Sequence, residues 1–530
     1  MVRGGIYIVN VAGIGDKSEK HSCNGGNGVK EHNGAGATEL KKYDYQEAIN
    51  ISGNGSYNYG LLAVLSLSLL GMGIDIFGFS VIVTGSACDF QLELWQKNIM
   101  LSMPFVGPIV MSIAWGYISD TQGRRKALLI ALWGSFLSSF ISAFSPNWII
   151  LALLKVFSSS FCSAVQSVAY ALLNESCTSA VKGVYMLIMT SVLMLFVLSY
   201  VVPAYYILQL SFAYNIGFLT FTPWRLLTIL LAAPLGISAF FLHFYYESPK
   251  FLVNAGREEL ALEFLAKIWT RNGKKDKYPV HKVVLHEELS FKTQDMHILK
   301  SLWLQTIPLF KPPLIWRTLQ LFYLTAVIYG TNNSLVMWMP YIIGAFTSGT
   351  NSSTSDGSRS LCSILRSTAN ISSVVDSTTC SSSIQFHTLL SGITHGLVFA
   401  SITLVVSKLA SWKKLLMIMF LLIPALSSLG AIFNQNNLAS LILFVGMTMT
   451  NLCMGVLFSY YVELYPTSYS GMAACLGVLV ARFSGLAGVN FLGSFVMMHC
   501  TMTFYVFTGY LMSGVIVALF LPPDIKPKEV

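Results

Sequence analysis

The sequence is a succession of apolar segments, each close to the length of a membrane-spanning helix. A helix needs about 20 residues to cross the hydrocarbon core of a bilayer. Twelve segments approach or exceed this length: 61–84, 98–119, 127–144, 148–172, 183–209, 223–246, 315–345, 387–407, 413–433, 438–461, 471–494 and 502–521. Because backbone polar groups in hydrocarbon must bond within their own segment, we expect all twelve to be α-helices.

The composition of the chain agrees with a membrane location. Hydrophobic residues make up 54% of the chain and charged residues 11%, with a mean hydropathy of +0.62, whereas soluble domains carry about 25% charged residues. The net charge of +9 is spread over short loops and forms no single patch, which argues against nucleic acid as a partner. The 9 cysteines show no C-x-x-C spacing, so we expect neither a metal site nor a cofactor. The expected partner is the lipid bilayer.

A long polar stretch divides the twelve segments into two groups of six. The expected parts are an N-terminal tail at 1–60, a first six-helix half at 61–246, a central loop at 247–312, a second half at 313–521 and a short tail at 522–530. Residues 1–40 are rich in Gly, Asn, Lys and Glu, which is typical of a disordered tail. The central loop contains an expected amphipathic helix at 256–272 with one apolar face, made of Leu260, Phe264, Leu265 and Ile268.

The distribution of basic residues predicts the orientation of the chain. Cytoplasmic loops of membrane proteins carry an excess of Lys and Arg. With the N-terminus in the cytoplasm, the great majority of the 33 basic residues fall on that side, and the outer loops hold only Lys97, Arg225, Arg359 and Arg366. Both termini are therefore expected to be cytoplasmic.

A polar motif joins the second and third segments. It contains two glycines, one carboxylate and three cations: Gly116, Asp120, Gly123, Arg124, Arg125 and Lys126. We expect Gly116 to allow close helix approach and Gly123 to permit a tight turn. Asp120 lies at a helix end beside the cations, where it can pair with them or cap a neighbouring helix. A loop that only fixed the orientation would explain the cations but not the glycine and aspartate spacing.

This motif resembles the G-x-x-x-D-x-x-G-R-R/K signature of the major facilitator superfamily. A weaker copy exists in the second half, because one sequence offset maps Arg125 onto Lys413 and Glu175 onto Glu463. The resemblance implies an all-α integral membrane fold of twelve helices in two six-helix pseudo-repeats. It also implies a cytoplasmic gate in which Glu175 and Glu463 join the motif in a charge network.

Further motifs are similar to those of sugar and organic-ion transporters. They are Tyr246–Leu252, Glu463–Thr467 and Trp224-Arg225. The large outer loop at 346–386 and the run Gly85–Asp89 resemble the synaptic-vesicle-glycoprotein-2-like transporters, especially insect-type members. This resemblance implies transport of a small organic solute.

The fourth segment departs from the pattern of this group. Lys155 stands where an arginine is usual, and Ser159, Phe161 and Ser163 replace glycines. We therefore expect looser packing of this helix. These departures sustain an alternative function, a non-transporting membrane glycoprotein of vesicles or the plasma membrane that acts through protein partners. An enzyme is not expected, because we find no paired catalytic carboxylates, nucleophile motif or phosphate-binding loop.

Polar residues inside the spans are the candidate substrate or coupling residues, because charge in hydrocarbon is costly. They are Asp75, Lys155, Asn332, Asn333, Trp338, His395 and Arg482. Asp75 can act as a proton carrier or as the counter-ion of a cationic solute, and we expect it to face the central cavity with Arg482 as its partner. The alternative is a structural salt bridge from Asp75 to Arg482 or Lys155. A lone histidine such as His395 is more often a packing residue, and Trp338 can equally line a cavity or act as an interface anchor.

The outer loop generates a prediction about modification. It carries the sequons at Asn351 and Asn370, and Cys362 and Cys380 lie within it at a spacing that permits a disulfide. We expect glycan at Asn351 and Asn370 only, which mapping of glycopeptides by mass spectrometry will test. Glycan on Asn174 would contradict the predicted orientation.

Overall fold

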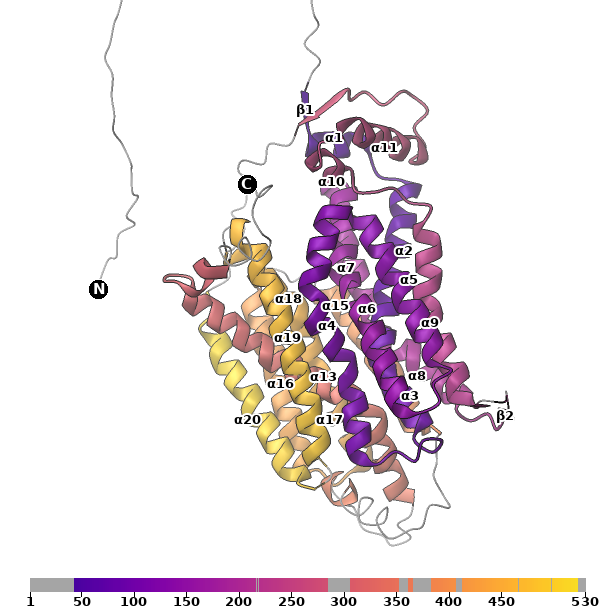
Figure 1. The fold of residues 1–530 in the computed structure, drawn as a ribbon. Coiled ribbons are helices and arrows are strands. Elements are labelled where there is room, and N and C mark those ends of the chain that lie inside the picture. Colours follow the sequence, from indigo (N-terminus) through magenta and orange to yellow (C-terminus); the bar gives the residue numbers. More distant parts are fainter. Residues whose placement is uncertain are drawn as a thin grey trace, which may run out of the picture. The chain divides into compact units, whose positions relative to one another are not determined.

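The computed structural model describes residues 42–215, 217, 219–284, 306–351, 361–365, 383–406, 412–465, 467–496 and 498–522. Within these ranges each of the twelve predicted segments is helical (Figure 1). The predicted disordered tail at 1–40, Asn370 and Cys380 lie outside the described residues.

The helices of the first half match the first six predicted segments. Two of these segments, 61–84 and 183–209, are each divided into two helices. The helices are α2 (Ser56–Phe77) with α3 (Phe79–Ser86), α4 (Leu94–Gln122), α5 (Arg124–Ser142), α6 (Trp148–Ser176), α7 (Ser179–Met194) with α8 (Phe196–Ile207), and α9 (Pro223–Leu242). Two short strands precede α9 and pair antiparallel, β2 (Tyr214–Asn215) and β3 (Thr220–Phe221).

The second half follows the short 3-10 helix η1 (Ile307–Phe310). Its elements are α13 (Ile315–Asn351), α15 (Phe386–Val406), α16 (Lys413–Phe433), α17 (Asn437–Met447), η4 (Thr448–Leu452), α18 (Cys453–Glu463), α19 (Thr467–Phe495) and α20 (Cys500–Leu519). Of the twelve segments, 10 are long and apolar enough to cross a membrane. The other two are α5, which begins with three cations, and α13, which carries Asn332 and Asn333.

Part of the predicted N-terminal tail is folded onto the central loop. Strand β1 (Lys42–Asp44) pairs in parallel with β4 (Lys282–Val284), and α1 (Tyr45–Ser52) packs on α11 (Glu258–Arg271). Burial, with a smaller effect of the Glu175 charge, raises the pKa of Tyr45 well above its ordinary value. Its hydroxyl therefore stays protonated and donates a hydrogen bond to the backbone carbonyl of Glu175.

Helix α11 confirms that 256–272 contains a helix, but its buried face differs from the predicted one. Ala261, Leu265 and Ile268 are buried, whereas Leu260 is 41% exposed. The buried face is rotated relative to the predicted one, because α11 packs against α1 and α10 (Pro249–Asn254) as well as α2.

The expected looseness of α6 is wrong. A Cβ atom on Gly107 of α4 would lie 2.5 Å from the Oγ atom of Ser159, and one on Gly134 of α5 would lie 2.5 Å from the ring of Phe161. The small residues that permit close approach are therefore on the helices facing α6. Ser159 and Phe161 fill the space that these glycines leave, so the helices still pack tightly.

The main contacts between the two halves are those of α4 with α19, of α7 and α8 with α15, and of α3 with α13. Between described residues, two asparagines make the polar contacts that cross this interface. The Nδ2 atom of Asn98 donates to the carbonyl of Asn490 and the hydroxyl of Ser494, each at 3.4 Å. The Nδ2 atom of Asn451 lies 3.2 Å from the sulfur of Met194.

The expected Cys362–Cys380 disulfide is wrong. Cys362 lies in a helical turn at 361–365 and is bonded to Cys500 at the start of α20, with Cα atoms 5.4 Å apart. A cysteine forms one disulfide, so Cys380 is excluded as its partner. Proximity in sequence suggested a bond within the loop, but the turn packs on α20, and the bond instead closes a separation of 138 residues.

Non-reducing digestion should release a peptide that links Cys362 to Cys500. Replacing Cys500 with serine should lower the free energy of unfolding by about 2–5 kcal/mol, because a long closed loop restricts the unfolded chain. Thermal unfolding in detergent measures this, with Cys475→Ser as the control, since Cys475 is free. Equal unfolding of the two variants without reductant would contradict the bond.

Candidate functional site

The turn between α4 and α5 depends on Gly123. Its φ of +106° is a backbone conformation that side chains disfavour. A Cβ atom there would also lie 2.5 Å from the Oε2 atom of Glu247. The predicted tight turn is therefore confirmed. The expectation for Gly116 is wrong in this conformation, because a Cβ atom on it would meet no described atom within 4 Å.

Glu247, just after α9, caps the start of α5. Its Oε1 atom accepts from the backbone N–H of Arg125 at 2.8 Å, and Oε2 accepts from that of Lys126 at 3.2 Å. The Arg125 side chain reaches back and donates to the carbonyl of His243 at 2.7 Å. In the sequence, Glu247 belongs to the Tyr246–Leu252 motif, but no role was expected for its side chain. Glu247 lies more than a hundred residues after the start of α5, so its position two residues before Pro249 does not predict that it caps this helix.

Arg124 links two carboxylates at the same end of the bundle. Its guanidinium forms an ion pair with Asp120 and lies 3.5 Å from Glu175. Ser248 donates to the other oxygen of Glu175 at 2.6 Å. The side chain of Asp120 is 68% exposed and that of Glu175 only 15%, so Glu175 is the stronger partner. We call Asp120, Arg124, Glu175 and Glu247 the motif cluster. The side chain of Glu463 lies outside the described residues.

Asp75 is buried inside the first half. It is 6% exposed, and one carboxylate oxygen lies 2.8 Å from the Nζ atom of Lys155 on α6. Ser139 of α5 and Ser158 of α6 donate to the same carboxylate, Ser158 at 3.0 and 3.1 Å. Breaking such a buried pair leaves an uncompensated charge at a cost of about 3–5 kcal/mol.

The expectation that Arg482 partners Asp75 is wrong, since Lys155 takes that place. The side chain of Lys155 reaches the carboxylate of Asp75 and also donates to its backbone carbonyl. The alternative of a structural salt bridge is therefore what the structure shows. Asp75 lines neither the cavity beside Lys97 and Trp338 nor the cavity beside Phe491 and Tyr510.

Arg482 lies near the middle of α19 and is only 7% exposed. Its guanidinium is close enough to the hydroxyl of Tyr329 on α13 and the thiol of Cys162 on α6 to interact electrostatically. Among the residues that the structure describes, none forms an ion pair or hydrogen bond with it. A charge at the centre of a span costs about 2.5–3.5 kcal/mol even on a lenient scale. Asp75 and Lys155 pair with each other, so Arg482 is the charged candidate that lacks an ion-pair partner among the described residues.

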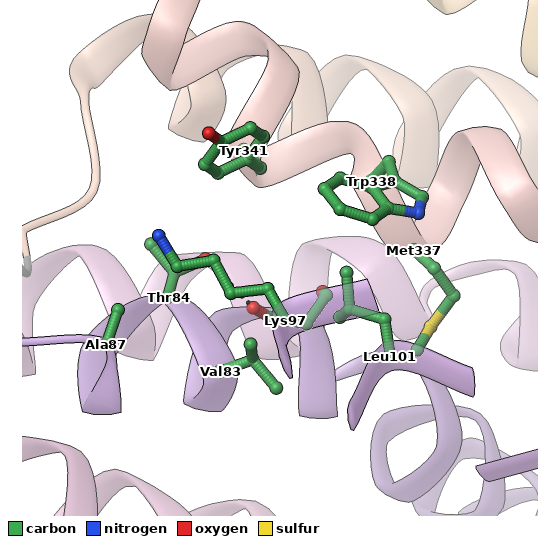
Figure 2. A pocket seen from close by; sticks show the side chains of 9 residues that line it. Val83, Thr84, Ala87, Lys97, Leu101, Met337, Trp338 and Tyr341 are labelled. Carbon is green, nitrogen blue, oxygen red and sulfur yellow. Dashed lines mark hydrogen bonds between the residues drawn. The ribbon is translucent and has the colours of Figure 1, made fainter. Parts of the chain in front are cut away.

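A cavity of about 110 Å³ lies between the two halves at the end opposite the motif cluster. Figure 2 shows Lys97 of α4 lying across it toward Tyr341 of α13, with Trp338 beside them. The Nζ atom of Lys97 is 5.3 Å from the ring centre of Tyr341, and the Nε1 atom of Trp338 donates to the carbonyl of Val489 at 3.1 Å. The sequence reasoning counted Lys97 as an outer-loop cation. The lining residues are Ser80, Val83, Thr84, Ala87, Lys97, Leu101, Met337, Trp338 and Tyr341.

The remaining candidates are buried polar side chains with unused bonding capacity. Asn332 and Asn333 bond weakly to each other at 3.5 Å, and Oδ1 of Asn332 and Nδ2 of Asn333 find no partner among the described residues. His395 shares a hydrogen bond of 3.1 Å with Thr448 and packs on Phe399 with ring centres 4.1 Å apart. The structure thus brings Asn333 of α13 against Gly485 of α19, one turn from Arg482, whereas His395 of α15 contacts Thr448 of η4.

Comparison with known proteins identifies this architecture. The family model described as Major Facilitator Superfamily matches residues 63–489. The synaptic vesicle 2-related protein of Rattus norvegicus is 24% identical over 486 residues, which cover 91% of this chain and 81% of that protein. The organic cation/carnitine transporter 7 of Arabidopsis thaliana is 24% identical over 268 residues, 49% of this chain and 50% of that protein.

A solved structure with the same fold is the partially occluded, inward-open xylose transporter XylE from E. coli. It matches with a TM-score of 0.62 and 14% identity, over 90% of this chain and 100% of that one. At this identity the likeness concerns the fold.

The cap formed by Glu247 can be tested by substitution. Replacing Glu247 with alanine removes the acceptor for two backbone N–H groups at the start of α5. The free energy of unfolding should fall by about 0.5–2 kcal/mol, as for other lost caps. Thermal unfolding in detergent measures this, with Glu263→Ala as the control because its ion pair with Lys267 is solvent-exposed. If both variants unfold alike, the cap contributes nothing.

Proposed function

The chain belongs to the major facilitator superfamily, and we propose that it moves a small organic solute across the membrane by alternating access. The family consists of transporters, so an enzymatic role is set aside. The observation that carries the proposal is a pair of buried polar side chains where the halves meet: Arg482, which has no ion-pair partner among the described residues, and Asn333, whose Nδ2 atom has no acceptor among them. Polar groups kept at mid-membrane without partners mark solute pathways.

The interface between the halves suits a rocking motion. It is held by few polar bonds, chiefly those of Asn98, and by close apolar contacts such as Gly392 of α15 against Val201 of α8. When the halves separate along this interface, water can replace the hydrogen bonds that are broken. Each half, in contrast, is internally fixed by buried bonds such as Asp75–Lys155. The halves can therefore move as rigid bodies around a site at the middle of the membrane.

We assign the motif cluster to the cytoplasmic side, with both termini, because of the excess of basic residues there. In the described conformation its contacts stay within the first half, from α4 and α5 to the end of α6 and to Ser248. We propose that it holds this half in one shape while its exposed surface meets the second half in the inward-closed state.

Proton coupling is the finer part of the proposal, and Asp75 is its candidate. It is the one carboxylate in the interior of the spans of this sequence, since Asp120 and Glu175 lie at helix ends. Protonation would remove its charge and release Lys155 from the ion pair. Ser139 and Ser158 bridge α5 and α6 to the same carboxylate, so a change in its charge would alter the packing of three helices.

The alternative is a non-transporting membrane glycoprotein. It rested on the lost glycines of α6, and the tight contacts of Gly107 and Gly134 with that helix remove this reason. The similarity to the synaptic vesicle 2-related protein leaves it as the competing hypothesis of the experiment that follows.

The test is uptake of labelled organic anions, cations and neutral solutes by the full chain in proteoliposomes. We expect saturable uptake of at least one solute, and stimulation by an inward proton gradient. Asp75→Asn should abolish the stimulation and retain exchange of solute for solute, because exchange requires no net proton movement. Glu263→Gln, which removes an exposed carboxylate, is the control. Absence of uptake with every solute would favour the non-transporting alternative, and an unchanged gradient response in Asp75→Asn would place coupling elsewhere.

A further inference from the structure

We propose that the transported solute carries an anionic group, a carboxylate or sulfonate, and that Arg482 binds it between the two halves. This inference rests on the proposed transport function and specifies its substrate class. It departs from the cationic solute that Asp75 suggested in the sequence.

The charges inside the membrane do not balance at the interface. Asp75 is the one carboxylate in the interior of the spans, and Lys155 already neutralises it at 2.8 Å. The carboxylates at the helix ends, Asp120 and Glu175, contact Arg124. Arg482 therefore has no counter-ion among the described residues of the protein. A buried charge requires an opposite charge or hydrogen-bond acceptors, and an anionic solute supplies both.

The position of Arg482 is that of a central transport site. It lies near the middle of α19, and the side chains within electrostatic range of it, Cys162 and Tyr329, belong to α6 of the first half and α13 of the second. A solute bound there contacts elements of both halves. The guanidinium is more than nine-tenths buried, so a solute reaches it only when the halves separate on one side, as alternating access requires.

The side chains around Arg482 are rich in hydrogen-bond donors. Gly485 follows Arg482 by one turn of α19, and a Cβ atom on it would lie 2.5 Å from the Nδ2 atom of Asn333. That amide nitrogen is buried and has no acceptor among the described residues. Asn333 also lies one turn after Tyr329, on the same face of α13. Arg482, Asn333 and Tyr329 thus lie on adjoining turns of α19 and α13, and a guanidinium, an amide N–H and a phenolic O–H are donors of the kind that a planar oxyanion accepts from.

Lys97 provides a second cation at the interface between the two halves. It spans the cavity of about 110 Å³ between α3, α4 and α13, and no described carboxylate pairs with it (Figure 2). The cavity wall holds the rings of Trp338 and Tyr341, which suit an apolar body attached to the anionic group. A positive entrance attracts anions and repels cations over several ångströms. Both interface cations therefore select the same sign of charge.

The experiment compares probes that share a framework and differ in charge. They are benzoate, benzamide and benzyltrimethylammonium, with propionate, propionamide and tetramethylammonium as an aliphatic set. Thermal unfolding of the purified full chain is followed at equal ionic strength. We expect the carboxylates to raise the unfolding midpoint of the wild type above the neutral and cationic probes. Arg482→Gln should raise the concentration needed for half of this effect by on the order of tenfold, since a charge-assisted bidentate bond is lost.

Two further variants keep the result interpretable. Arg482→Lys retains the charge without the planar fork and should give an intermediate response; it also replaces the glutamine variant if that one does not fold. Lys267→Gln removes an exposed cation outside the spans and should respond like the wild type. Stabilisation by cations or neutral probes equal to that by carboxylates, a full response in Arg482→Gln, or no stabilisation by any carboxylate would each overturn the proposal.

Uptake into proteoliposomes separates this inference from the proposed function. A carboxylate that stabilises the protein through Arg482 but is never taken up would overturn transport and leave the anion site in place. Saturable uptake of a cation that Arg482→Gln leaves unchanged would overturn the anion site and leave transport in place.

Discussion

A formal charge inside hydrocarbon needs an opposite charge or enough polar atoms to replace water. The two halves differ in how they meet this requirement. The first half satisfies it internally, because Asp75 is held by Lys155 and by two serines from α5 and α6. That arrangement ties α2, α5 and α6 into one unit. In the second half Arg482 is buried and has no ion-pair partner among the described residues. A rigid first half and an unsatisfied central cation are together what a site for an external ligand requires.

The motif cluster solves a related problem at the helix ends. The first N–H groups of α5 have no partners within the helix, and Glu247 supplies them from the end of α9. Gly123 permits this cap. Its positive φ turns the chain into α5 beside Glu247, and its lack of a side chain leaves room for the carboxylate. Arg124 and Ser248 then connect the same region to Glu175 at the end of α6. Three loops distant in sequence are joined by one set of charged side chains.

Two helices pack closely when either one of them carries a small residue at the contact. The absence of glycine from one helix therefore does not predict loose packing. The glycines expected on α6 are absent, yet Gly107 and Gly134 on its neighbours receive Ser159 and Phe161. In the second half, a Cβ atom on Gly488 of α19 would lie 2.1 Å from the carbonyl of Gly330 on α13. That close contact aligns α13 and α19, so that Asn333 and Gly485 adjoin and the amide comes near Arg482.

The sequence alone determined the twelve helices, the membrane location and the family, because these follow from local properties: the length of apolar segments, the count of charges and a short motif. It also identified Asp75, Lys155 and Arg482 as the charges that needed explanation. The tertiary structure decided which of them pair. Lys155 reaches Asp75 because α2 and α6 pack within one half, whereas α19 presents Arg482 from the other half. It likewise decided that Cys362 bonds Cys500, that Glu247 caps α5 and that Lys97 lies across a cavity. Each of these joins residues far apart in the chain, and their proximity results from the packing of whole helices, which no local pattern records.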